Sequence, residues 1–179
     1  MNKDTNEQLF PDAEIIVPTA ELNWWTRPEV DGMDLGPTRK GLSQRIRNTM
    51  ATWKNVRPVD GEADLIPGVR AIQAAGHSPG QVAHLVSSGR QHLLVTADVS
   101  LLPALFVRNP EWQVRVDQDP LMAVETRKRI FDRAIADKLM INGPTGSYQV
   151  SAQLPKTDTD MLSLPPRSSE HGLPLVAQG

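Results

Sequence analysis

The chain has 179 residues, of which 39% are hydrophobic and 22% charged, which is enough for one folded domain with a core of its own. Its 19 Lys and Arg against 21 Asp and Glu give a formal net charge of −2, so we expect no nucleic-acid partner. No apolar run approaches the roughly 20 residues that span a bilayer, and the polar N-terminus lacks a signal segment, so we expect a cytoplasmic protein that does not enter a membrane.

The N-terminal part of the chain is expected to contain a strand and a short helix. Residues 1–8 are polar and should be frayed. The β-rich run Ala13–Val17 predicts a strand that ends at a proline. Thr19 is a candidate N-cap for a helix that Pro28 would stop.

A second helix and a second strand follow. Residues 31–41 are rich in Gly and Pro and predict a loop. From Leu42 to Trp53 the apolar residues recur in steps of three and four, which is typical of a helix. After a turn at Asp60–Glu62, the run Val69–Ala74 predicts a strand.

Two further β-rich runs predict a hairpin over residues 81–97. The loop Gly76–Gly80 leads into Gln81–Val86, and Ser87–Arg90 then turns the chain. The returning run His92–Ala97 is nearly all apolar, which is typical of a strand covered on both faces. This strand is expected to end at Asp98.

The C-terminal part begins with a mixed loop over residues 99–118. Asp119 and Pro120 then favour the start of the longest helix, with Asp as N-cap and Pro in the first turn. Arg127–Arg129 are expected on the exposed face of this helix, and Leu139–Ile141 as a last strand. Strands, a hairpin and helices together indicate an α/β fold.

The composition changes near residue 148. Residues 148–179 are rich in Ser, Thr and Pro without any periodicity, so we predict a disordered tail after a frayed segment 1–8 and a domain over 9–147. Limited proteolysis should therefore cut after Tyr148 before it cuts the domain. Cleavage inside 9–143 at an earlier time would contradict this division.

His77 and Asp98 are the most informative polar residues. His77 lies in the restricted loop Gly76–Gly80, where an imidazole can bind a metal or simply hydrogen-bond to the backbone. Asp98 follows an apolar strand, where its carboxylate would be hydrogen-bonded, paired, bound to a metal or a cap of the next turn. Since an antiparallel hairpin begins and ends at one sheet edge, we expect the two side chains to converge so that one ion or water can bridge them.

The remaining histidines and the tryptophan pair favour simpler interpretations. The sequence has no Cys, so any metal site would use His and carboxylates. His84 alternates with Val in a strand and is expected to pack, His92 beside a turn is expected to be solvated, and His171 lies in the tail. Trp24–Trp25 is expected to pack the short helix rather than to bind a ligand.

The order of these features resembles the metallo-β-lactamase superfamily. Gly76–Gly80 is similar to the third metal-binding motif of that family, and Asp98 to its bridging aspartate. The stretch from Leu9 to Gly143 resembles the methyl parathion hydrolase and lactonase branch. The resemblance implies part of an αββα sandwich, the C-terminal half, in a family with two zinc ions at one sheet edge. It implies hydrolysis of an ester, lactone or phosphotriester, with His77 as a ligand of one zinc and Asp98 as the carboxylate that bridges both.

Most of the family's other metal ligands have no counterpart. The motif His-x-His-x-Asp-His, which in the family precedes the segment similar to Leu9, does not occur, and Gln81 stands where the third motif has its second His. Gly143–Thr145 stands where the family has its last His ligand. We therefore expect a truncated or degenerate member in which zinc binding at His77 and Asp98 is weak or absent and the chain alone is inactive.

Two other functions are also compatible with the sequence. Half of a sandwich would leave an apolar sheet face uncovered, which favours a non-catalytic binding or dimerising domain covered by a second copy or a partner chain. The chain could instead be a non-functional remnant. Zinc titration combined with an activity assay would best separate these alternatives from a hydrolase.

Overall fold

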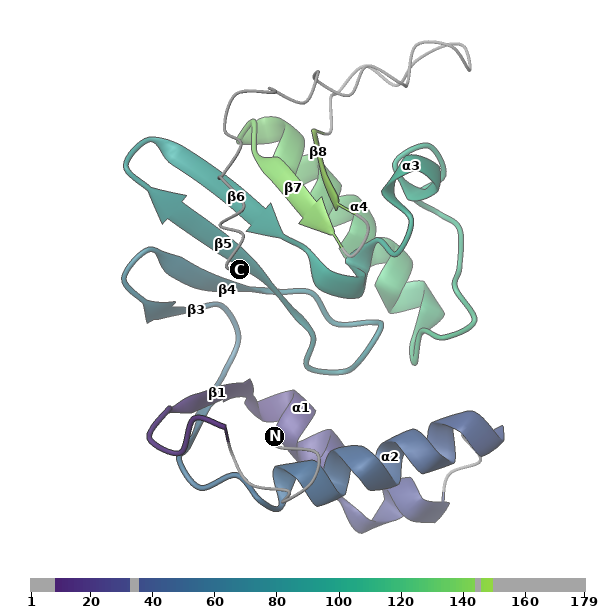
Figure 1. The fold of residues 1–179 in the computed structure, drawn as a ribbon. Helices are drawn as coiled ribbons and strands as arrows, with labels where there is room; N and C mark the ends of the chain where they lie inside the picture. Colours follow the sequence, from purple (N-terminus) through teal and green to yellow (C-terminus); the bar gives the residue numbers. More distant parts are fainter. Residues whose placement is uncertain (1–8, 33–35, 144–145, 150–179) are drawn as a thin grey trace, which may run out of the picture.

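The structure, a computed structural model, describes residues 9–32, 36–143 and 146–149. Six strands form one sheet in the order β3-β4-β5-β6-β7-β8, and β1 pairs with β2 in a separate two-stranded sheet. The six-stranded sheet and the long helix α4 occupy the upper part of Figure 1, with β1, α1 and α2 below them. The α/β class predicted from the sequence is confirmed.

The smaller unit differs from the sequence prediction at two helix starts. Its elements are β1 (Ile15–Pro18), α1 (Thr19–Thr26), the 3-10 helix η1 (Pro28–Gly32), α2 (Gly36–Met50) and β2 (Val56–Val59). Thr19 is not the N-cap: Pro18 holds that position, and the Thr19 hydroxyl donates to Val59 O at 3.3 Å, an acceptor that only the tertiary structure supplies. Helix α2 starts at Gly36, inside the predicted loop, because Pro37 is compatible with a first helical turn.

The larger sheet contains the predicted hairpin. Its strands are β3 (Ala63–Ile66), β4 (Val69–Gln73), β5 (Val82–Ser88), β6 (Gln91–Val95), β7 (Met140–Gly143) and β8 (Gly146–Gln149). All neighbours are antiparallel except β6 and β7, which are parallel. The sequence did not predict β2, β3 or β8, and β8 includes the first two residues of the predicted tail. The remainder of that tail, residues 150–179, lies outside the described residues.

Helix α4 (Pro120–Ala136) connects β6 to β7 in sequence and packs on one face of the sheet (Figure 1). Its start is as predicted, because Asp119 Oδ1 accepts a hydrogen bond from the backbone N–H of Met122 at 2.9 Å. Ile130 and Phe131 of the helix share a buried cluster with Leu94 and Ile141 of the sheet. Burying such aliphatic and aromatic side chains supplies the main driving force that fixes α4 on the sheet.

The connection between β6 and α4 corrects another sequence expectation. Strand β6 ends at Val95 rather than at Asp98, which lies in the 3-10 helix η2 (Ala97–Val99). The backbone leaves the sheet here because Ala97 has a φ of +47°, in the left-handed region. A short helix, α3 (Pro103–Phe106), lies within the predicted loop. None of the described helices is both long and apolar enough to cross a membrane.

Candidate metal-binding site

The loop between β4 and β5 holds His77 against the start of α4. Two backbone hydrogen bonds tie these segments together, from Asp119 N–H to Gly76 O at 2.9 Å and from Gln118 N–H to His77 O at 3.2 Å. Gly76 has a φ of +137°, and its Cα lies so close to the backbone of Ala123 that a Cβ would overlap it. Glycine is therefore required for the loop to approach the helix this closely.

Helix α1 holds the other end of the same loop. The backbone N–H of Gly80 donates to Glu21 Oε2 at 2.8 Å, while Glu21 Oε1 accepts from Trp25 Nε1 at 2.6 Å. A Cβ on Gly80 would also overlap the backbone of Glu21. The smaller unit thus positions the loop, and Trp25 packs the helix as predicted.

The side chain of His77 lies between two carboxylates. Its Nδ1 is 2.9 Å from Asp117 Oδ1, and its Nε2 is 3.6 Å from Asp98 Oδ2. The expected convergence of His77 and Asp98 is confirmed, whereas their role as metal ligands stays a prediction. The His77 and Asp98 side chains are 27% and 44% exposed, so the edge where they meet is open to solvent.

Gln81 helps to position Asp98. With its amide oriented so that the oxygen faces donors, Gln81 accepts hydrogen bonds from the backbone N–H groups of Asp98 at 3.0 Å and Val99 at 3.2 Å. These two bonds hold η2 against the start of β5. The residue at the position where the family resemblance implies a second His therefore supports the backbone of Asp98.

Sequence reasoning missed Asp117 and misplaced Arg127. Asp117 is buried and hydrogen-bonds to His77, although nothing local in the sequence connects them. Arg127 was expected on the surface but is buried, 1% exposed, since it lies on the same face of α4 as Ala123 and Ile130. Its spacing of four and three residues from these two was the signal that could have revealed its burial.

The other candidate residues lie apart from this pair. His84 pairs with Ala71 and Val95 inside the sheet, in the packing position expected for it. His92 is exposed and its Nδ1 lies 2.9 Å from Ser87 Oγ. His171 lies outside the described residues. Trp24 contacts the guanidinium of Arg27, 3.6 Å from the ring centroid.

The distance between His77 Nε2 and Asp98 Oδ2 is compatible with two ligands of one zinc ion. Ligands about 2.1 Å from a tetrahedral zinc lie roughly 3.4 Å from one another, close to the observed Nε2–Oδ2 distance of 3.6 Å. Within the described residues, however, no group of three or more His, Asp or Glu side chains could hold a metal ion. A catalytic zinc takes three protein ligands, and the described residues do not bring three such side chains together.

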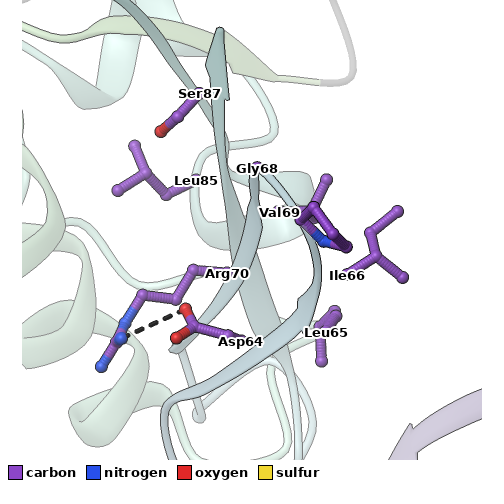
Figure 2. A pocket seen from close by; sticks show the side chains of 9 residues that line it. Asp64, Leu65, Ile66, Gly68, Val69, Arg70, Leu85 and Ser87 are labelled. Carbon is purple, nitrogen blue, oxygen red and sulfur yellow. Dashed lines mark hydrogen bonds and ion pairs between the residues drawn. The ribbon is translucent and has the colours of Figure 1, made fainter. Parts of the chain in front are cut away.

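A surface depression of about 600 Å³ lies at the opposite end of β4 and β5 from His77. It is lined by apolar side chains such as Ile66, Val69 and Leu85 (Figure 2). Its charged lining residues, Arg70 and Asp64, pair with one another at 3.2 Å. Neither His77 nor Asp98 lines this depression, so it is separate from the candidate site.

Comparison with solved structures shows which known fold this chain shares. AbOPH, a hydrolase in the β-lactamase superfamily, is similar over 82% of this chain and 57% of its own length, with 20% identity and a TM-score of 0.67. AidC, a dizinc quorum-quenching lactonase, is similar over 85% of this chain and 59% of its own, with 19% identity and a TM-score of 0.68. This chain has part of the metallo-β-lactamase fold.

A further structure with this likeness is a probable metal-dependent hydrolase from Staphylococcus aureus, with 16% identity and a TM-score of 0.60. No family model matches the sequence, and no curated protein does. The chain spans less than two thirds of AbOPH and AidC. The metallo-β-lactamase fold implied by the sequence resemblance is thus confirmed for the part of those proteins that this chain covers.

Proposed function

We propose that His77 and Asp98 are two ligands of a zinc-dependent hydrolase centre, and that this chain by itself has an incomplete, inactive centre. The observation that carries the proposal is the convergence of His77 Nε2 and Asp98 Oδ2 at 3.6 Å. The metallo-β-lactamase fold of the chain, and the zinc in the name of AidC, support the choice of metal.

Asp117 orients the imidazole of His77 for metal binding. A carboxylate accepts hydrogen bonds, so the Nδ1 atom that lies 2.9 Å from Asp117 donates its proton to it. Nε2 then keeps its lone pair and faces Asp98. Metal-binding histidines commonly donate their other N–H to a carboxylate in this way, which fixes the tautomer and the ring orientation.

The proposed reaction is hydrolysis of an ester, lactone or phosphotriester. When bound in a complete site, zinc supplies an activated water and stabilises the negative charge that develops on the substrate. The exposed edge beside His77 and Asp98 leaves room for a substrate to approach. The lactone class is supported by the name of AidC, which is a lactonase.

Two ligands are too few for efficient catalysis. An ion held by two protein side chains stays mostly hydrated, so the pKa of its water would stay nearer the value of about 9 in solution than the value of about 7 in a tuned site. Metal affinity also depends on several deprotonated ligands held in place together. The chain alone should therefore bind zinc weakly and lack hydrolytic activity.

Calorimetric zinc titration and hydrolysis of an aryl ester and a lactone test this function. The wild type should bind zinc with a dissociation constant weaker than micromolar, and His77→Ala should abolish that binding while the exposed His92→Ala retains it. None of these three proteins should hydrolyse the aryl ester or the lactone faster than buffer that contains zinc. Micromolar or tighter binding with His77-dependent turnover would contradict the incomplete centre, and zinc binding unaffected by His77→Ala would contradict the ligand assignment.

A further inference from the structure

We propose that Arg127 is a positioning residue for the site, which holds Asp117 beside His77 and also holds the backbone that carries Asp98. This inference deepens the function proposed above and rests on it for its significance. Arg127 is one residue on α4, yet it contacts both segments that bring carboxylates to His77.

The first contact of Arg127 is with Asp117. Their side chains are 2% and 1% exposed, and Arg127 Nη2 lies 3.9 Å from Asp117 Oδ2. That oxygen accepts no hydrogen bond from the described residues, whereas Oδ1 of the same carboxylate faces His77 Nδ1. A buried carboxylate is costly without a nearby cation, so loss of the guanidinium would favour rotation of Asp117 away from His77.

The second contact of Arg127 is with the backbone between η2 and α4. Its Nε donates to Val99 O at 2.8 Å, next to Asp98. Its Nη1 donates to Pro110 O at 2.9 Å and to Trp112 O at 2.7 Å. A planar guanidinium with five N–H groups can bind several carbonyl groups at fixed angles, which an ammonium cannot reproduce.

The guanidinium itself is held in place. It lies over the ring of Phe106 in α3, 4.4 Å from the ring centroid, while its stem belongs to the buried face of α4. Val99, whose carbonyl group accepts from Arg127, lies two residues after Ala97. The backbone of Ala97 is in the left-handed region, a conformation that persists only when the surrounding structure holds it. Arg127 therefore couples the position of Asp98 to the orientation of His77.

Nuclear magnetic resonance of the metal-free chain tests this role through the tautomer of His77. In the wild type at alkaline pH, the ¹⁵N signals of His77 should show a proton on Nδ1 and none on Nε2. Arg127→Met should lower the ratio of this tautomer to the other by about tenfold and shift the amide signals of Asp98 and Val99. Arg127→Lys should restore much of the tautomer ratio, because it keeps a cation near Asp117, but not the amide signals.

Arg129→Met is the matched control, because Arg129 lies on the exposed face of the same helix and donates to Gln73 O. It should leave both readouts unchanged. A folded Arg127→Met variant with wild-type tautomer and amide signals would overturn the proposal. Zinc is absent from the measurement, so failure of the zinc titration would refute the proposed function without affecting this result.

If Arg127→Met does not fold, a measurement on the wild type can still test the proposal. The Nε–H of Arg127 should exchange with water at least about tenfold more slowly than that of Arg129, since only Arg127 is buried. Equal exchange rates would overturn the proposal, as would a folded Arg127→Lys variant whose Asp98 and Val99 amide signals match the wild type.

Discussion

Replacement of Gly76 by Ala is expected to lower the free energy of unfolding by about 3–4 kcal/mol. The new Cβ would overlap the backbone of Ala123 in the first turn of α4, and the φ of +137° is one that L-residues rarely adopt. Backbone cannot move aside as a flexible side chain does, so either the loop or the helix must shift. Urea unfolding, followed by circular dichroism, measures the loss.

Gly89→Ala is the matched control for this variant. Gly89 also has a positive φ, +57°, but apart from its neighbours in the chain no described residue has an atom within 4 Å of a Cβ built there. Its substitution should therefore cost only about 1 kcal/mol, the penalty of the left-handed conformation. Equal losses for the two variants would show that the contact between the His77 loop and α4 is not as close as described.

Replacement of Asp117 by Ala should destabilise the protein by about 3 kcal/mol. The change removes the carboxylate that faces buried Arg127 at 3.9 Å and deprives His77 Nδ1 of its acceptor. Asp117→Asn keeps an oxygen that can accept from His77 and should cost less, about 1 kcal/mol. The same urea titration gives both values.

Asp64→Ala provides the comparison for a surface pair. Asp64 is paired with Arg70 at 3.2 Å, but its side chain is 77% exposed. Solvent screens such a pair, so its loss should cost less than about 1 kcal/mol. If Asp117→Ala proved as mild as Asp64→Ala, the buried carboxylate would not contribute to the stability of the site.

The sequence predicts only some of the residues of the candidate site. His77 and Asp98 could be found because each lies beside a strand that the sequence indicates, and because hairpin geometry brings the ends of such strands together. Asp117 could not be found, since its partner His77 is 40 residues away and the loop between them has no regular pattern. The charge of Arg127 indicates an exposed residue, whereas its position on the apolar face of α4 indicates the buried one that the structure contains.

By itself, the sequence determined the elements that depend on neighbouring residues. Asp119 and Pro120 start α4 through a local cap, and the apolar runs around Ser87–Arg90 define the hairpin of β5 and β6. Only the tertiary structure decided that Val56–Val59 is a strand, because this segment pairs with distant Ile15–Pro18 and contains a proline. It likewise decided the hydrogen-bond partners of buried Arg127, because the carbonyl groups that accept from its guanidinium belong to a segment whose path the sequence does not specify.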